Sequence, residues 1–115
     1  PALALPLVRP VRALGLVVAA GLPGARRCRG LGLFNRVVPQ ASLPEGTATW
    51  AAQLAALPPI AAGLAKHAVY ESHRSDLSAT LAFEYEAQAK CFHSEDAAEG
   101  IAAFTSKRVP TFRGR

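Results

Sequence analysis

Helix start and stop signals divide residues 42–115 into short segments, and this division constrains the fold more than any other feature. Pro58-Pro59 ends one helical pattern and can begin the next, because proline breaks a helix interior but suits its first turn. Ser75, Asp76 and Ser94 are small polar residues of the kind that cap helix N-termini. The sequence therefore predicts four short helices, with no internal repeat and no coiled-coil heptads.

The limits of these helices follow from the same signals. A capping box of Ser42 and Glu45, in which each side chain binds the other residue's backbone N–H, is expected to start the first helix. Glu95 and Asp96 follow the Ser94 cap in the first turn of the last helix, where negative charge is favourable. The four helices are expected at about 43–57, 59–71 and 77–92, and from 95 to just before Pro110.

Apolar residues at helical spacing indicate the face that each helix should bury. In chain order they are Leu43, Trp50, Leu54 and Leu57; Ile60, Leu64, His67 or Ala68, and Val69; Leu77, Leu81, Tyr85, Gln88 and Phe92; and Ala98, Ile101, Ala102 and Phe104 or Thr105. Ahead of them, residues 32–39 (GLFNRVVP) favour a β-type stretch that Pro39 ends. Such short helices bury a modest core, so we expect them to need another domain or subunit.

The first third of the chain has an unusual composition. Residues 1–32 use only Pro, Ala, Leu, Val, Arg, Gly and one Cys. Residues 1–44 contain six arginines and no acid, so most of the net charge of +5 belongs to this part. The apolar run at residues 13–22 allows a short buried helix or strand, although no capping residue precedes it. We therefore treat residues 1–31 as an atypical, irregular segment and residues 32–115 as the domain.

Three interpretations of residues 1–31 stay open. The first is a targeting peptide, with Arg9 and Arg12 before an apolar run too short to span a bilayer. The second is a nucleic-acid-binding arm at residues 25–30 (ARRCRG), which lacks lysines and interleaved aromatic residues. The third is a frameshifted or degenerate core remnant, because a GC-rich gene read in the wrong frame yields this restricted set of residue types. The coding DNA tests the third: it fails if the neighbouring frame upstream of Gly32 gives no better sequence.

Catalytic and metal-binding patterns are scarce. His67, His73 and His93 are scattered without the spacing of a metal site. Glu84 and Glu86 are two positions apart on a predicted helix, so they point to different faces and make a poor acid–base pair. No nucleophile elbow, P-loop or dinucleotide fingerprint is present. On these grounds alone the chain is a helical interaction or accessory module with a basic end.

The two cysteines, Cys28 and Cys91, are far apart in the sequence and belong to no CxxC pair. Their ordinary interpretation is two reduced thiols, as in an intracellular protein. We therefore expect a cytoplasmic location.

Three stretches resemble one family in order and spacing. They are GLFNRVVP (32–39), LAALPPIAAGLAKHAV (54–69) and SEDAAEGIAAFTSKRVPTFRGR (94–115). Together they are similar to the C-terminal part of the enoyl-CoA hydratase/isomerase (crotonase) family, whose ending follows S-x-D-x-x-E-G-x-x-A-F-x-x-K-R-x-P-x-F-x-G. The resemblance implies a mainly α chain, the C-terminal helical part of a crotonase-like α/β fold built from a ββα spiral.

Several functional expectations come with this resemblance. It implies acyl-CoA thioester substrates, hydration of 2-enoyl-CoA in fatty acid metabolism, a trimer or hexamer of identical subunits, and no metal or redox cofactor. In the family, two backbone N–H groups stabilise the thioester oxyanion and glutamates handle water and the proton. Both oxyanion segments and both glutamates lie N-terminal to the matching stretches, so the resemblance assigns no catalytic residue here. We expect no activity from this chain alone, and no nucleic-acid or membrane partner.

The resemblance assigns two substrate-binding residues, Phe104 and Lys107. They match terminal family positions that contact the adenosine-phosphate end of CoA, often across a subunit boundary. A lysine ammonium pairs with phosphates and a phenyl ring packs beside a nucleotide. The alternative is that Phe104 belongs to the core and that Lys107 only supplies positive charge at a helix C-terminus. Two rival functions for the whole chain also stay open, a non-catalytic helical interaction or oligomerisation module and a basic nucleic-acid-binding protein.

Overall fold

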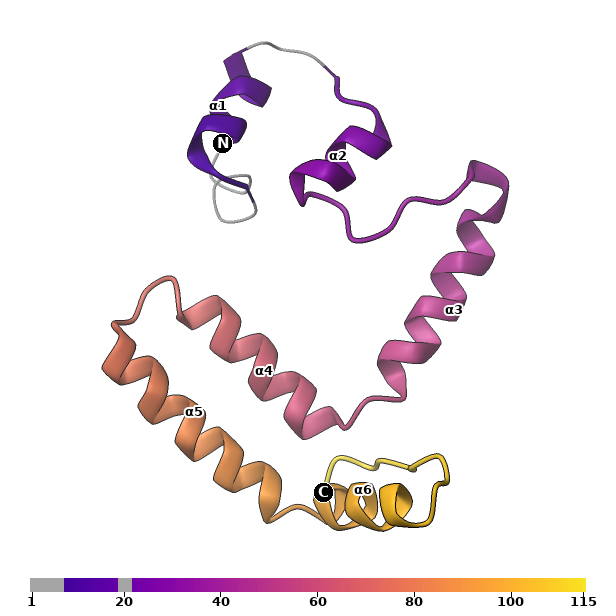
Figure 1. Cartoon of the computed structure of the whole chain (residues 1–115), viewed down its shortest axis with the longest axis vertical. Helices are drawn as coiled ribbons and strands as arrows, with labels where there is room; N and C mark the ends of the chain where they lie inside the picture. The colour runs from indigo at the N-terminus through magenta and orange to yellow at the C-terminus, as the bar shows by residue number, and fades with distance from the viewer. Residues whose placement is uncertain (1–7, 19–21) are drawn as a thin grey trace. The chain divides into compact units, whose positions relative to one another are not determined.

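The structure is a computed structural model that describes residues 8–18 and 22–115. It consists of two compact units, Pro1–Gly46 and Thr47–Arg115, which are described separately below. The described residues form helices and contain no strand (Figure 1), so the expected mainly α architecture is confirmed. No single helix among them is long and apolar enough to cross a membrane. Only the segments 40–55 and 59–71, taken together as a sharply bent pair, reach that length and composition.

The first unit holds two short helices, α1 (Pro10–Val18) and α2 (Ala25–Leu31). Ala13 and Cys28 are buried, and the Cys28 thiol donates to the Pro23 carbonyl oxygen at 3.5 Å. The helix α2 was missed at the sequence level because nothing resembling a cap precedes it: Gly24 forms no side-chain cap. The apolar run at 13–22 is helical as far as Val18, and its residues 19–21 lie outside the described part.

The β-type stretch predicted at residues 32–39 is wrong. The segment has no regular secondary structure and leads into a 3-10 turn, η1 (Gln40–Ser42), and then into α3 (Leu43–Ala55). A strand persists only where a neighbour satisfies its N–H and C=O groups, and the described residues offer none. The predicted capping box is also wrong. Ser42 ends a 3-10 turn continuous with α3, whereas an N-cap residue needs extended backbone.

The second unit contains α4 (Pro59–Glu71), α5 (Leu77–Phe92) and α6 (Glu95–Thr105). The limits of α4 and α5 are those predicted from prolines and caps. Asp76 accepts a hydrogen bond from Ala79 N at 2.8 Å, and Ser94 accepts one from Ala97 N at 3.1 Å. The helices α4 and α5 form an antiparallel hairpin, and α5 then contacts α6 (Figure 1).

The predicted apolar face is confirmed on α4, where Ile60, Leu64 and Ala68 are partly buried, and it is wrong on α5. On α5 the partly buried residues are Thr80, Phe83, Ala87, Ala89 and Cys91. Phe83 packs against His67 of α4 with ring centroids 4.9 Å apart. The predicted stripe lies instead on an exposed face, with Tyr85 78% exposed. The α5 helix is apolar on two sides, and the described residues cover only the side made of small residues and Phe83.

On α6 too, the face predicted to be buried is exposed. The buried residues of this helix are Asp96 and Ala103, while Ile101 and Phe104 of the predicted buried face are exposed. The closing segment, residues 108–115, folds back along α6, and the Phe112 ring lies 3.6 Å from where a Cβ would stand at Gly100. The helix therefore packs against its own C-terminal extension through Ala103, Gly100 and Asp96, and leaves its larger apolar side chains uncovered.

The caps provide a test of this fold. Asp76→Ala removes the acceptor for Ala79 N, so we expect the free energy of unfolding to fall by about 1 kcal/mol. Urea unfolding followed by circular dichroism measures the change. Ser75→Ala is the matched control, since Asp76, rather than Ser75, is the capping residue. Equal losses for the two variants would contradict the assigned cap.

Candidate functional site

The two predicted site residues lie together at the C-terminus of α6. Phe104 is in its last turn and is 88% exposed, so its side chain is not part of the core of this chain. Lys107 follows the helix and is also exposed. Lys107 makes no ion pair with any residue that the structure describes. An aromatic ring and an ammonium three positions apart are thus presented to solvent on one turn of the chain.

Lys107 has a rare backbone conformation. Its φ is 51°, in the left-handed region, and it is the one residue other than glycine with a positive φ among those described. Its N–H donates to the Phe104 carbonyl oxygen at 3.2 Å, and Arg108 N donates to the Ala103 carbonyl oxygen at 3.0 Å. These two bonds make a Schellman motif, in which the left-handed position is usually glycine. The helix α2 follows the usual pattern, with Gly32 at φ 86°.

A lysine at this position carries a cost. A left-handed residue with a Cβ is disfavoured by about 1–2 kcal/mol relative to the right-handed form. The structure nevertheless holds Lys107 there, and backbone strain of this kind is common at ligand sites. The conformation turns the chain so that Lys107 leaves the helix while Arg108 turns back toward it.

Glu99 of α6 holds the segment that follows Lys107. Its carboxylate accepts two hydrogen bonds from the Arg108 guanidinium, at 2.6 and 2.7 Å, and one from Thr111 N at 2.8 Å. A bidentate pair of this type fixes the orientation of both side chains. The Arg108 and Thr111 hydrogen bonds lower the pKa of Glu99 from 4.5 to about 2. The same pair raises the pKa of Arg108 above its ordinary value.

Asp96, one turn earlier on α6, holds the end of the chain. It is only 5% exposed, and its two carboxylate oxygens accept from Arg113 N at 2.7 Å and Gly114 N at 2.8 Å. Its own N–H donates to the Arg115 carbonyl oxygen at 3.2 Å. The Arg115 side chain forms an ion pair with Glu95 at 2.8 Å. Three carboxylates on α6 therefore bind the closing segment.

Glu95 and Asp96 were predicted only as favourable charges at the start of the helix, and no role was predicted for Glu99. A signal was present, because the acids at 95, 96 and 99 precede basic residues at 108, 113 and 115. Opposite charges across a helix end predict that the chain folds back. Which acid meets which base depends on the turn at Lys107, and local spacing does not show that turn.

The other polar candidates do not converge on a site. His93 Nδ1 lies 2.7 Å from the carbonyl oxygen of Ala89 in its own helix, and His67 packs on Phe83. Glu84 and Glu86 are exposed. Within the described part of the chain no three His, Cys, Asp or Glu side chains are grouped so as to hold a metal ion. Both cysteines are free thiols.

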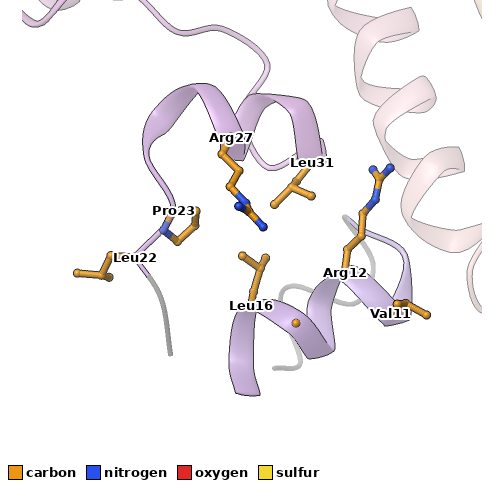
Figure 2. A pocket seen from close by; sticks show the side chains of 8 residues that line it. Val11, Arg12, Leu16, Leu22, Pro23, Arg27 and Leu31 are labelled. Atoms are coloured by element: carbon orange, nitrogen blue, oxygen red, sulfur yellow. The ribbon is translucent and has the colours of Figure 1, made fainter. Parts of the chain in front are cut away.

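One cavity lies in the first unit (Figure 2). It measures about 530 Å³ and is bounded by α1 and α2, with Arg27 reaching from α2 toward Leu16 of α1. Its lining consists of Val11, Arg12, Gly15, Leu16, Leu22, Pro23, Arg27 and Leu31. Two guanidinium groups among apolar side chains supply neither a general base nor a nucleophile. The cavity does not include Phe104 or Lys107.

Comparison with known proteins gives one consistent family. The model of the enoyl-CoA hydratase/isomerase family matches residues 9–115. A probable enoyl-CoA hydratase from Mycobacterium bovis is 36% identical over 107 residues, which cover 90% of this chain and 40% of the relative. The 1,2-epoxyphenylacetyl-CoA isomerase of Escherichia coli is 31% identical over 104 residues, with the same coverage. The chain thus spans about 40% of the length of these curated relatives.

Solved structures agree with the sequence matches. An enoyl-CoA hydratase from Polaromonas sp. JS666 superposes with a TM-score of 0.89 at 30% identity, over 96% of this chain and 43% of that one. An enoyl-CoA hydratase from Bacillus anthracis gives 0.88 at 33% identity, over 95% and 42%. The predicted C-terminal helical part of a crotonase-like fold is confirmed. The family match begins well before Gly32, so it includes most of the arginine-rich segment; its proposed origin in another reading frame stays a prediction.

The turn at Lys107 provides a stability test. Lys107→Gly removes the left-handed penalty, so we expect the free energy of unfolding to rise by about 1 kcal/mol in urea denaturation. Ser106→Gly is the control, because Ser106 has a negative φ of −86° and glycine there only adds freedom to the unfolded chain. A destabilised Lys107→Gly variant would contradict the motif.

The stability of the chain at low pH tests the lowered pKa of Glu99. Its pKa is lowered on folding, so its contribution is complete above about pH 4.5 and is lost as the pH falls toward 2. We expect Glu99→Gln to lose less stability than the unchanged chain over that interval, because it has no proton to take up there. Unfolding curves at a series of pH values measure the difference. Parallel losses in both proteins would contradict the assigned pKa.

Proposed function

The chain belongs to the enoyl-CoA hydratase/isomerase family, and from this premise we propose that it is the CoA-binding C-terminal part of a protein that acts on acyl-CoA thioesters. Hydration of a 2-enoyl-CoA in fatty acid metabolism is the reaction we propose for the complete protein. The names of its relatives support this choice, since several are enoyl-CoA hydratases. Isomerase chemistry is the second candidate, supported by the relative from Escherichia coli.

Phe104 and Lys107 are the proposed contacts to CoA. The observation that carries this proposal is the left-handed backbone of Lys107, an exposed residue three positions after the exposed Phe104. CoA carries a 3′-phosphate and a diphosphate on its adenosine, so an ammonium and a flat apolar ring match its charge and shape. The local field also suits an anion, because Glu99 and Arg108 neutralise each other and leave the Lys107 charge available.

This chain supplies binding residues and no assigned catalytic group, so we propose that it is inactive by itself. The acids of α6 all bind the closing segment: Asp96 and Glu99 accept hydrogen bonds from its backbone, and Glu95 forms an ion pair with Arg115. The test is a hydration assay with crotonyl-CoA, in which the isolated chain is expected to show no turnover. Turnover above the uncatalysed rate would overturn this part of the proposal.

Assembly with identical subunits is also proposed, as a trimer or hexamer. It is supported by the exposed apolar stripe of α5, made of Leu77, Leu81, Tyr85 and Phe92, and by exposed Ile101 on α6. Large apolar side chains that are exposed along one face of a helix often mark an interaction surface. The alternative function, a non-catalytic helical oligomerisation module, rests on this same surface. A cytoplasmic location is part of the proposal and is supported by the two free thiols.

Binding measurements separate these functions. We expect Lys107→Glu to weaken CoA binding by about tenfold or more, because it replaces an ion pair with repulsion. Dephospho-CoA, which lacks the 3′-phosphate, tests which phosphate the ammonium meets. Lys66→Glu is the matched control, since Lys66 is exposed on α4 and its substitution changes the net charge equally. Isothermal titration calorimetry gives the affinities, and equal affinity for both variants would favour the oligomerisation module.

A further inference from the structure

Glu99 is placed to control the one residue that the proposed function depends on most. Glu99 is eight positions before Lys107 in the sequence. Its carboxylate nevertheless accepts two short hydrogen bonds from Arg108, the residue immediately after Lys107. It also accepts from Thr111 N. The chain on the C-terminal side of Lys107 is therefore anchored at two points to the helix on its N-terminal side.

This anchoring bears directly on the strained turn. A Schellman motif with lysine in the left-handed position is disfavoured relative to one with glycine, so it needs support from outside the two backbone hydrogen bonds. Arg108 N provides one of those two bonds, to the Ala103 carbonyl oxygen. When Glu99 fixes the Arg108 side chain, it holds the same residue whose N–H closes the motif. Release of Arg108 would let Lys107 relax to a right-handed or extended conformation and move its ammonium.

We propose that Glu99 is a positioning residue for CoA: its bidentate pair with Arg108 keeps Lys107 in the left-handed conformation that presents the ammonium to a phosphate. This inference rests on the proposed function. Glu99 itself does not touch the ligand in this scheme. As an anion beside a phosphate site it would repel the ligand, and its pairing with Arg108 removes that penalty.

The test compares CoA affinities of variants of the full 115-residue chain by isothermal titration calorimetry. Glu99→Gln keeps the shape of the side chain and removes its charge. We expect it to weaken CoA binding by roughly three- to thirtyfold through loss of the turn. Glu95→Gln is the matched control, because it removes the same charge from the same helix and breaks only an exposed ion pair with Arg115. Its affinity is expected to equal that of the unchanged chain.

A double variant separates positioning from a general structural role. If Glu99 acts through the Lys107 ammonium, Glu99→Gln has no further effect on CoA affinity in a Lys107→Ala background. An equal loss in both backgrounds would overturn the proposal, as would unchanged affinity in the single variant. The Hα and Cα chemical shifts of Lys107 in NMR spectra provide a readout independent of ligand. They are expected to lose their left-handed values in Glu99→Gln and to keep them in Glu95→Gln.

The outcomes also distinguish this inference from the proposed function. If Lys107→Glu leaves CoA affinity unchanged, the proposed binding role fails, whatever Glu99 does to the turn. If Lys107→Glu weakens binding but Glu99→Gln does not, the binding role stands and the positioning role is overturned. If Glu99→Gln weakens binding while the Lys107 chemical shifts do not move, Glu99 acts on CoA by another route and the positioning role is overturned.

Discussion

Two carboxylates of α6 hold the end of the chain in place, and the candidate site depends on them. Asp96 is buried, and its oxygens accept from consecutive backbone N–H groups of Arg113 and Gly114. A buried carboxylate is stable when N–H groups surround it, and the N-terminus of a helix adds to this. Glu99 does the same one turn later with Arg108. Between these anchors and the helix the chain must reverse, and Lys107 is where it does so.

The energetics of the turn connect structure to function. The helix end could have used glycine, as α2 does at Gly32, but it uses lysine at φ 51°. The conformational penalty of the left-handed Lys107 is offset by the hydrogen bonds that the residues before and after it make. The turn leaves Lys107 exposed and without an ion pair to the described residues, three positions after the exposed Phe104. This arrangement suits a phosphorylated nucleotide such as the adenosine end of CoA.

The α5 helix is covered on one of its two apolar sides by the described residues. Small residues and Phe83 pack α5 against its neighbours, while larger side chains such as Leu77 and Tyr85 stay exposed. A helix that is apolar on two sides belongs between two partners. The described residues supply one of them. The side of α5 that carries Leu77 and Tyr85 is left uncovered by the described residues.

Sequence reasoning located the helices better than their faces. Pro58-Pro59, Asp76 and Ser94 act locally, so they fixed the limits of α4 and α5 and the start of α6 without knowledge of the tertiary structure. Face selection is not local. The stripe through Tyr85 obeys helical spacing as well as the stripe through Phe83, and only the choice of partner decides which is covered. The left-handed turn at Lys107 could not be predicted from the sequence either, because the glycine that usually marks such a turn is absent.

We propose that the turn after α6 binds the phosphorylated end of CoA. Titration of the isotopically labelled chain with CoA, followed residue by residue in NMR spectra, tests it most directly. The largest chemical-shift changes are expected at Phe104, Lys107 and Arg108, and they are expected to shrink with dephospho-CoA. Shifts centred instead on Arg12 and Arg27 of the first unit, or an absence of shifts at Lys107 under saturating CoA, would contradict it.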